Sequence, residues 1–157
     1  MITVKITGLT ELQQGLAAGI KATPTEMRAA MELSLSLVES DMRRLVPRDT
    51  GQLGNSITHG ISGSSTDLLG LVGPTARHGA FVEQGTRPHW PPIDAISPWA
   101  YRHGIPPFLV ARAIARHGTK ARPFIKPAME HNRGRVMAIF EAIGVKIGMT
   151  ITSGGRR

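Results

Sequence analysis

The sequence predicts a single α+β domain in which a small, mainly antiparallel sheet packs against two long helices. Three observations predict this class: short apolar segments of strand length, two long stretches with apolar residues at helical spacing, and a proline-rich helical insert between them. At 157 residues the chain suits one domain with a core of its own. The predicted strands are residues 2–7, 56–62 and 67–73, the long helices residues 24–46 and 126–144, and the insert residues 88–118.

The amino-terminal segment is predicted to be a strand followed by a short helix. Apolar and polar residues alternate over residues 2–7, which is typical of a half-buried strand, and Gly8 ends the alternation. Leucine and isoleucine then recur at helical spacing over residues 9–20. The chain is therefore expected to begin with a strand and a helix.

The first long helix has a clear predicted start and end. Thr23 is suited to the N-cap, Pro24 to the first helical position and Glu26 to the third, which together form a capping box. An apolar stripe follows at alternating spacings of four and three, and Pro47 disfavours helical backbone in the residue before it. These signals predict a helix over residues 24–46.

A turn and a hairpin are predicted next. Asp49 and Thr50 can accept hydrogen bonds from nearby backbone N–H groups, and Gly51 allows a positive φ. The strands at residues 56–62 and 67–73 are separated by a short polar connection. They are expected to pair antiparallel.

Three short helices are predicted from their flanking glycines and prolines. The segment "RHGAFVEQG" has the length of about two helical turns and ends at Gly85. Within the insert, "IDAISPWAYRHG" is closed by Gly104, and a second helix runs from Pro107 to Gly118.

The carboxyl-terminal part is predicted to contain the second long helix, with Pro127 at its first position. The segment "ARPF", residues 121–124, is considered as a further strand of the sheet. Residues 145–151 alternate at period two, so they are expected to form either an edge strand or an arm that becomes ordered on assembly. Residues 148–157 are accordingly expected to be a flexible arm.

Composition limits the cellular context and the chemistry. The chain has no cysteine, so disulfides and thiolate metal sites are excluded and nothing requires an oxidising compartment. No leader-like segment and no apolar run of membrane-spanning length is present in the sequence. We therefore expect a soluble protein that is not exported and does not contact a membrane.

The net charge of +8 is concentrated in the second half of the chain. Residues 1–73 carry 6 basic and 7 acidic side chains, whereas residues 74–157 carry 13 basic and 4 acidic ones. Such asymmetry is typical of a surface that meets phosphate or an acidic protein, although a solvated basic face gives the same pattern. Several arginines of this basic half could contact DNA phosphate nonspecifically: Arg102, Arg112, Arg116, Arg122, Arg133 and Arg135.

Catalytic and metal-binding patterns are weak. The histidines lack the spacing that places two ligands on one helix face, and prolines separate them. No Gly-x-Ser-x-Gly elbow, phosphate-binding glycine loop or closely spaced carboxylate pair is present. We predict no enzyme activity, no metal and no cofactor.

Glu83 admits several roles. It could be a catalytic base in a hydrolase, a metal ligand with a nearby histidine, or a structural acceptor. Since a carboxylate near the carboxyl end of a helix is unfavourable unless it finds a donor, we expect it to stabilise the following turn. The expected donors are the Thr86 hydroxyl, the backbone N–H groups around Gly85, and Arg87; a contact with a neighbouring subunit is the alternative.

The order and spacing of three motifs resemble the tail-completion, or neck, proteins of long-tailed bacteriophages. The resemblance covers most of residues 1–145, although His78 and Gly79 stand where that family usually has Tyr-Ala. The first motif is Pro47, Asp49, Thr50, Gly51 and Leu53, followed by Ser56 and Ile57; the second is Phe81, Val82, Glu83, Gly85 and Thr86; the third is Pro123, Phe124, Pro127 and Ala128.

The resemblance implies a structural virion protein. Its copies would form a homo-oligomeric ring between the head-connector or adaptor proteins and the tail terminator or tube proteins. DNA would pass through the ring with weak nonspecific contact, and the six arginines named above would be candidates for the DNA channel or for a subunit interface. Such a protein would be assembled in the host cytoplasm and reside in the virion. The alternative from a different class is a cytoplasmic protein that binds double-stranded DNA nonspecifically through its basic second half.

Overall fold

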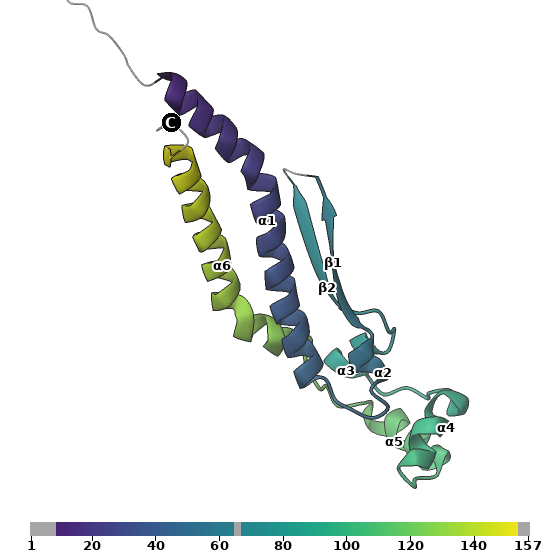
Figure 1. The fold of residues 1–157 in the computed structure, drawn as a ribbon. Coiled ribbons are helices and arrows are strands. Elements are labelled where there is room, and N and C mark those ends of the chain that lie inside the picture. The colour runs from purple at the N-terminus through teal and green to yellow at the C-terminus, as the bar shows by residue number, and fades with distance from the viewer. Residues whose placement is uncertain (1–8, 65–66, 154–157) are drawn as a thin grey trace, which may run out of the picture. The chain divides into compact units, whose positions relative to one another are not determined.

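The computed structural model describes residues 9–64 and 67–153, which form a two-stranded antiparallel sheet and six helices (Figure 1). The predicted α+β class is therefore confirmed. The strand predicted at residues 2–7 lies outside the described residues, as do the last four residues of the predicted arm. In chain order the elements are α1 (Leu9–Leu45), α2 (Gln52–Asn55), β1 (Ile57–Gly63), β2 (Leu68–Pro74), α3 (Gly79–Gln84), α4 (Ile93–Arg102), α5 (Pro107–His117) and α6 (Ile125–Ser153).

The chain divides into two compact units. Unit 1 comprises Met1–Asp41, Thr58–Val72 and Ala128–Arg157, and unit 2 comprises Met42–Ile57 and Gly73–Pro127. Unit 1 therefore holds most of α1, the hairpin and α6, whereas unit 2 holds the end of α1 and the shorter helices. The expectation of one domain stays a prediction.

Helix α1 is continuous through Pro24, so the predicted separation into a short helix over residues 9–20 and a long helix from Pro24 is wrong. Proline has a fixed φ near −65° that suits a helix, and what it removes is one hydrogen bond to the residue four positions earlier. The capping-box pattern at Thr23 thus lies inside the helix rather than at its start. The carboxyl end at Leu45 agrees with the stop predicted from Pro47 within one residue.

Within unit 1, α1 lies between the hairpin and α6 (Figure 1). On one side of α1, the Met31 and Leu35 side chains approach Gly70 of β2 so closely that an added Cβ would lie 2.6 Å from the Met31 sulfur. On the other side, Glu26 pairs with Lys146 of α6 at 2.9 Å and Asp41 accepts from the Asn132 amide at 3.1 Å. A glycine at position 70 therefore lets the strand lie directly on the helix.

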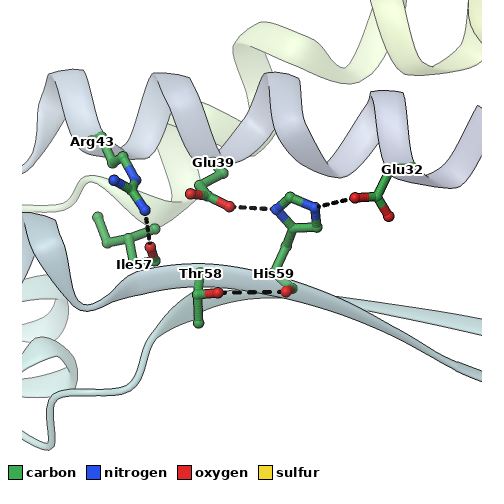
Figure 2. Close-up of polar contacts among 6 residues, drawn as sticks. All are labelled: Glu32, Glu39, Arg43, Ile57, Thr58 and His59. Atoms are coloured by element: carbon green, nitrogen blue, oxygen red, sulfur yellow. Dashed lines mark hydrogen bonds and ion pairs between the residues drawn. The ribbon is translucent and has the colours of Figure 1, made fainter.

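The hairpin is also held to α1 by one histidine between two glutamates (Figure 2). His59 Nε2 contacts Glu32 Oε1 at 3.0 Å, and His59 Nδ1 contacts Glu39 Oε2. The pKa of His59 is raised, first by the hydrogen bond to Glu32 and then by that to Glu39, which together outweigh the opposing effect of desolvation. Protonated His59 is therefore the form that best links β1 to α1.

The last helix is longer than the sequence predicted. Residues 145–151 are helical turns of α6, and helix continues to Ser153, so neither an edge strand nor a flexible arm forms over the described part of residues 148–157. Ile147, Thr150 and Ile151 are half-buried while Val145 and Met149 are exposed, which follows helical rather than period-two spacing. The period-two alternation contains one pair, Ile147 and Ile151, that is also four residues apart on one helix face, and continuation of the existing helix selects that spacing.

Two further expectations about the approach to α6 are wrong. Residues 121–124 are not a strand, because they lead directly into the first turn of α6. Pro127 is the third residue of α6 rather than its first, since the helix begins at Ile125. Pro127 still lies in the first turn, where a backbone N–H would have no acceptor within the helix, so the N–H that proline lacks is not needed there.

The core of unit 2 forms around the end of α1 and the start of β1. Met42, Ile57 and Phe124 are fully buried, and Val46 and Leu53 nearly so. An Arg43 guanidinium nitrogen donates to the Ile57 carbonyl at 2.6 Å (Figure 2), which satisfies a polar group at the edge of this core. Because Phe124 directly precedes α6, the approach to this helix includes a fully buried residue of unit 2.

None of the described helices is both long and apolar enough to cross a membrane.

Candidate functional site: the Glu83 corner

Residues of the second and third motifs meet in unit 2 at what we call the Glu83 corner, which comprises Glu83, Gly85, Thr86 and the segment from Thr119 to Pro127. The first motif lies in the same unit and forms the turn before β1. Gly51 adopts φ +80°, and the Thr50 hydroxyl accepts from the Gln52 N–H at 3.4 Å, as the predicted turn requires. Leu53, on the short helix that follows, is 7% exposed.

Asp49 has a different role from the cap that the sequence predicted. Its carboxylate pairs with the Arg102 guanidinium, from Nε at 3.3 Å and from Nη2. The hydrogen bond to Arg102 lowers the pKa of Asp49 below its ordinary value. Because both groups are solvent-exposed, the pair positions α4 near the turn more than it stabilises the fold.

Helix α3 connects the first motif to the second. It starts at buried Gly79, where an added Cβ would meet Pro74 at 2.6 Å and Leu53 at 3.3 Å. A glycine here allows α3 to approach Leu53 closely. Phe81 on the same helix is 61% exposed, so this motif residue does not contribute to the described core.

Glu83 is a structural acceptor, but its donors are not those that the sequence predicted. Its Oε2 accepts from the backbone N–H groups of Phe124 at 2.7 Å and Ile125 at 2.9 Å, and its Oε1 accepts from that of Lys126 at 3.0 Å. The Thr86 hydroxyl instead faces the Thr119 hydroxyl at 3.0 Å. The carboxylate thus closes the first turn of α6, which follows it by about forty residues.

One carboxylate is enough to satisfy the N–H groups at the start of α6 because few of them are open. The first N–H groups of a helix have no acceptor within it, and the positive end of the helix dipole favours an anion. Glu83 satisfies three of these N–H groups, and the next residue, Pro127, has none. Together they account for the open donors at this end of α6.

The protonation state of Glu83 follows from the same contacts. Burial raises the pKa of the Glu83 carboxyl, but the hydrogen bonds from the N–H groups of Ile125, Phe124 and Lys126 outweigh it, so the pKa lies below its ordinary value. A carboxylate with a low pKa and both oxygens engaged is a weak proton acceptor. This arrangement favours the structural role over a catalytic one.

The Glu83 corner also closes the base of the insert through two glycine-threonine pairs, which we call the Gly-Thr clasp: Gly85 with Thr86, and Gly118 with Thr119. The Thr86 N–H donates to the Thr119 carbonyl at 3.1 Å, and the Thr119 N–H donates to the Thr86 carbonyl at 3.2 Å. Gly85 and Gly118 have φ of +70° and +69°. A Cβ at either glycine would collide with the other pair's threonine carbonyl oxygen, so both positions require glycine.

The insert between the two pairs exposes large apolar side chains. Helices α4 and α5 pack on each other, and the Trp90 and Phe108 rings meet edge to face with centroids 5.9 Å apart. Trp90, Phe108 and Leu109 are each at least half exposed, and Tyr101 is 72% exposed. Exposed apolar clusters of this kind are typical of interaction surfaces.

The candidate arginines belong to both units. Arg112, Arg116 and Arg122 are exposed in unit 2, and Arg133 and Arg135 are exposed on α6 in unit 1. Arg102 is already paired with Asp49, which offsets its charge. A role for these residues in a DNA channel or a subunit interface stays a prediction.

The histidines of the insert take separate local positions. His103 is the C-cap of α4 and stacks on Trp99 with centroids 4.2 Å apart, and His117 is the last residue of α5, as their positions before glycines predicted. His89 Nδ1 lies 2.9 Å from the Arg87 carbonyl oxygen. Over residues 9–64 and 67–153, no group of three or more histidine and acidic side chains is arranged to hold a metal ion.

A scan against protein-family models and searches of curated proteins and of solved structures find no match to this chain.

The donors for Glu83 carry a sequence signal that the local interpretation missed. Pro127 marks the first turn of a helix, so the N–H groups just before it are expected to need an acceptor. The donors predicted for Glu83 are close to it in sequence, whereas Phe124 is separated from it by the whole insert. The clasp pairs were visible as two short helices that each end in Gly-Thr, at Gly85 and Gly118.

Proposed function

We propose that this chain is a structural subunit of the neck of a long-tailed bacteriophage, whose copies form a ring that joins the head connector to the tail and lets DNA pass. The observation that carries the proposal is the closure of the first turn of α6 by Glu83. This contact joins the second motif, through Glu83, to the segment of the third motif. Because both carboxylate oxygens are engaged, Glu83 is poorly suited to act as a catalytic base.

The other motif contacts support the same conclusion. Leu53 of the first motif lies beside Gly79 of α3, the helix that carries Glu83. The clasp fixes both ends of the insert, whose exposed aromatic side chains suit contacts with a neighbouring protein. A ring requires interfaces of two different patches repeated by rotation, and a projecting insert supplies one such patch.

The mass and shape of the purified protein test this proposal. We expect light scattering to give a discrete mass of many subunits, unchanged by moderate salt, and negative-stain images to show rings with a central opening. A monomer or dimer across a range of protein concentrations would contradict the proposed ring.

A second candidate function is nonspecific binding of double-stranded DNA without ring formation. The exposed Arg112, Arg116 and Arg122 of unit 2 favour it, because phosphate contact requires only a density of positive charge. Under this alternative a small oligomer would retain duplex DNA of any sequence at low salt, and retention would fall steeply as salt increases. Rings that form in the absence of DNA would argue against it.

A further inference from the structure

The Glu83 corner carries a surface hollow that the proposed function leaves without a role. The hollow has a volume of about 360 Å³ and is lined by Phe81, Thr86, Arg87, Pro88 and His89, all of which belong to unit 2. Its apolar lining comes from the Phe81 and Pro88 rings, and its permanent charge comes from Arg87. Because Phe81 is 61% exposed, packing within the described residues does not explain this motif residue.

The Arg87 side chain is available to a molecule outside the chain. The sequence predicted that it donates to Glu83, but both oxygens of that carboxylate accept from backbone N–H groups instead. Arg87 is exposed, and among residues 9–64 and 67–153 its guanidinium forms no ion pair. A guanidinium in this position keeps a planar set of N–H donors that matches a carboxylate.

Two further cations lie on the segment before α6, which runs beside α3 and the residues that follow it. The Arg122 N–H donates to the Val82 carbonyl at 2.8 Å, and a Cβ added at Gly85 would lie 3.2 Å from the Lys120 carbonyl carbon. Lys120 and Arg122 are both exposed, and neither forms an ion pair within the part of the chain that the structure describes. Three cations therefore belong to segments that meet at this corner.

Unit 2, all of whose residues the structure describes, has few acidic side chains that could neutralise this charge. It contains eleven lysines and arginines but three acidic residues, Asp49, Glu83 and Asp94. Asp49 pairs with Arg102, Glu83 accepts from the start of α6, and Asp94 lies in the first turn of α4. The charge at the corner is therefore complementary to carboxylates of another molecule.

The hollow favours a protein segment over nucleic acid. Its volume lies at the lower end of the ~300–1,000 Å³ that is typical of ligand pockets, and its exposed rings favour burial of an apolar group. A phosphate backbone would use the cations but leave the Phe81 and Pro88 rings in water. A carboxylate next to an apolar side chain would use both properties of this surface.

We propose that this surface, which we call the Arg87 face, binds a segment of a partner protein in which an apolar side chain is flanked by carboxylates. The apolar side chain would lie in the hollow against the Phe81 and Pro88 rings, and the carboxylates would pair with the cations. The inference does not rest on the proposed neck function, since such binding requires no ring. The residues of the Arg87 face are Phe81, Arg87, Pro88, His89, Lys120 and Arg122.

Selection from a peptide library tests the proposal. A displayed library of short random peptides is selected on the immobilised full-length protein, and the most enriched peptide is synthesised with a fluorescent label. We expect the enriched peptides to combine leucine or aromatic residues with aspartate and glutamate. Fluorescence anisotropy then measures the dissociation constant of the labelled peptide for the parent protein and for its variants.

Two variants each remove one property of the Arg87 face. We expect Arg87→Glu to weaken peptide binding at least ~tenfold, because an attractive pair becomes a repulsive one. Phe81→Ser should weaken it ~fivefold or more, since it removes apolar contact area. Both side chains are exposed, so urea unfolding should show unchanged stability for both variants. Arg135→Glu makes the same charge change at an exposed position of α6 and, as the matched control, should leave the dissociation constant unchanged.

Several results would overturn the proposal: no enriched peptide, an enriched peptide without carboxylates, or equal binding of the peptide by the parent and Arg87→Glu. Labelled duplex DNA is measured with the same variants. If Arg87→Glu keeps the peptide but loses the DNA, the Arg87 face binds phosphate, which also overturns the proposal. Light scattering of the parent protein judges the ring separately, so peptide binding and the neck function can each fail alone.

Discussion

At the level of single residues, Glu83 is expected to matter for stability through the three N–H groups that it accepts. In Glu83→Gln only one oxygen remains, and the amide N–H₂ group faces donors. We expect a loss of about 1–3 kcal/mol in unfolding free energy, as for removal of a charged acceptor from backbone donors that have no other acceptor within the helix. Urea unfolding measures it, with the exposed Glu141→Gln in α6 as a matched control that should change it by less than ~0.5 kcal/mol.

The effect of Glu83→Gln should depend on pH in a direction fixed by the lowered pKa of Glu83. A carboxyl whose pKa is lower in the folded protein stabilises it fully above the ordinary value of 4.5, and this stabilisation is lost as pH falls through the folded value. The difference between the parent and Glu83→Gln should therefore be constant near neutral pH and shrink in acid. An equal difference at all pH values would contradict the charged interaction.

His59 should show the opposite pH dependence. Its pKa is raised by Glu32 and Glu39, so protonated His59 stabilises the hairpin fully below the ordinary value of 6.5 and loses this effect as pH rises through the folded value. We expect the unfolding free energy of the parent to exceed that of His59→Gln most at mildly acidic pH. A difference that grows above neutral pH would show that the neutral ring is the stabilising form.

At the level of elements, the Gly-Thr clasp should depend on its glycines. Gly85→Val places a β-branched side chain at φ +70° and against the backbone of Thr119 and Ala121. We expect a loss of more than ~1 kcal/mol in unfolding free energy. Gly134→Ala in α6 is the control, because an added Cβ there meets nothing within 4 Å; it should stabilise the helix by ~0.5–1 kcal/mol. An unchanged urea midpoint for Gly85→Val would contradict the strain at this position.

The elements that the sequence predicted well have residues at both ends that stop a helix or form a turn. Helices α4 and α5 lie between prolines and glycines whose backbone preferences are local, and the predicted hairpin agrees with β1 and β2 within one residue. Pro24 misled the prediction because its φ suits both the start and the interior of a helix. Residues 145–151 misled it because their apolar spacing fits two periods, and only the preceding turns of α6 select one.

In the candidate site too, the features that depend on neighbouring residues could be predicted, whereas contacts between distant residues could not. The positive φ of Gly51 and Gly85 was predictable, since each follows a segment that must turn there. The partner of Glu83 was not, because a carboxylate indicates that it needs donors without indicating which distant N–H groups supply them. The pairing of Asp49 with Arg102 likewise joins residues more than fifty positions apart.

At the level of the whole molecule, the basic second half should act through weak contact with DNA if the chain forms a ring. DNA must slide through such a ring, so individual charges screened over ~8 Å should each contribute little. We expect weak retention of duplex DNA, independent of sequence and lost by moderate salt. The double variant Arg112→Glu with Arg116→Glu should reduce this retention while rings remain intact.

The competing account is that these arginines pair with acidic residues of an adjacent subunit, and the structure makes the most obvious partners less available. Glu32 and Glu39 contact His59, and Asp41 accepts from Asn132, so each acidic group already has a partner within unit 1. Sedimentation of the double variant without DNA decides between the accounts. Rings of unchanged mass with reduced DNA retention support a basic channel, whereas monomers would show that Arg112 and Arg116 hold the subunits together.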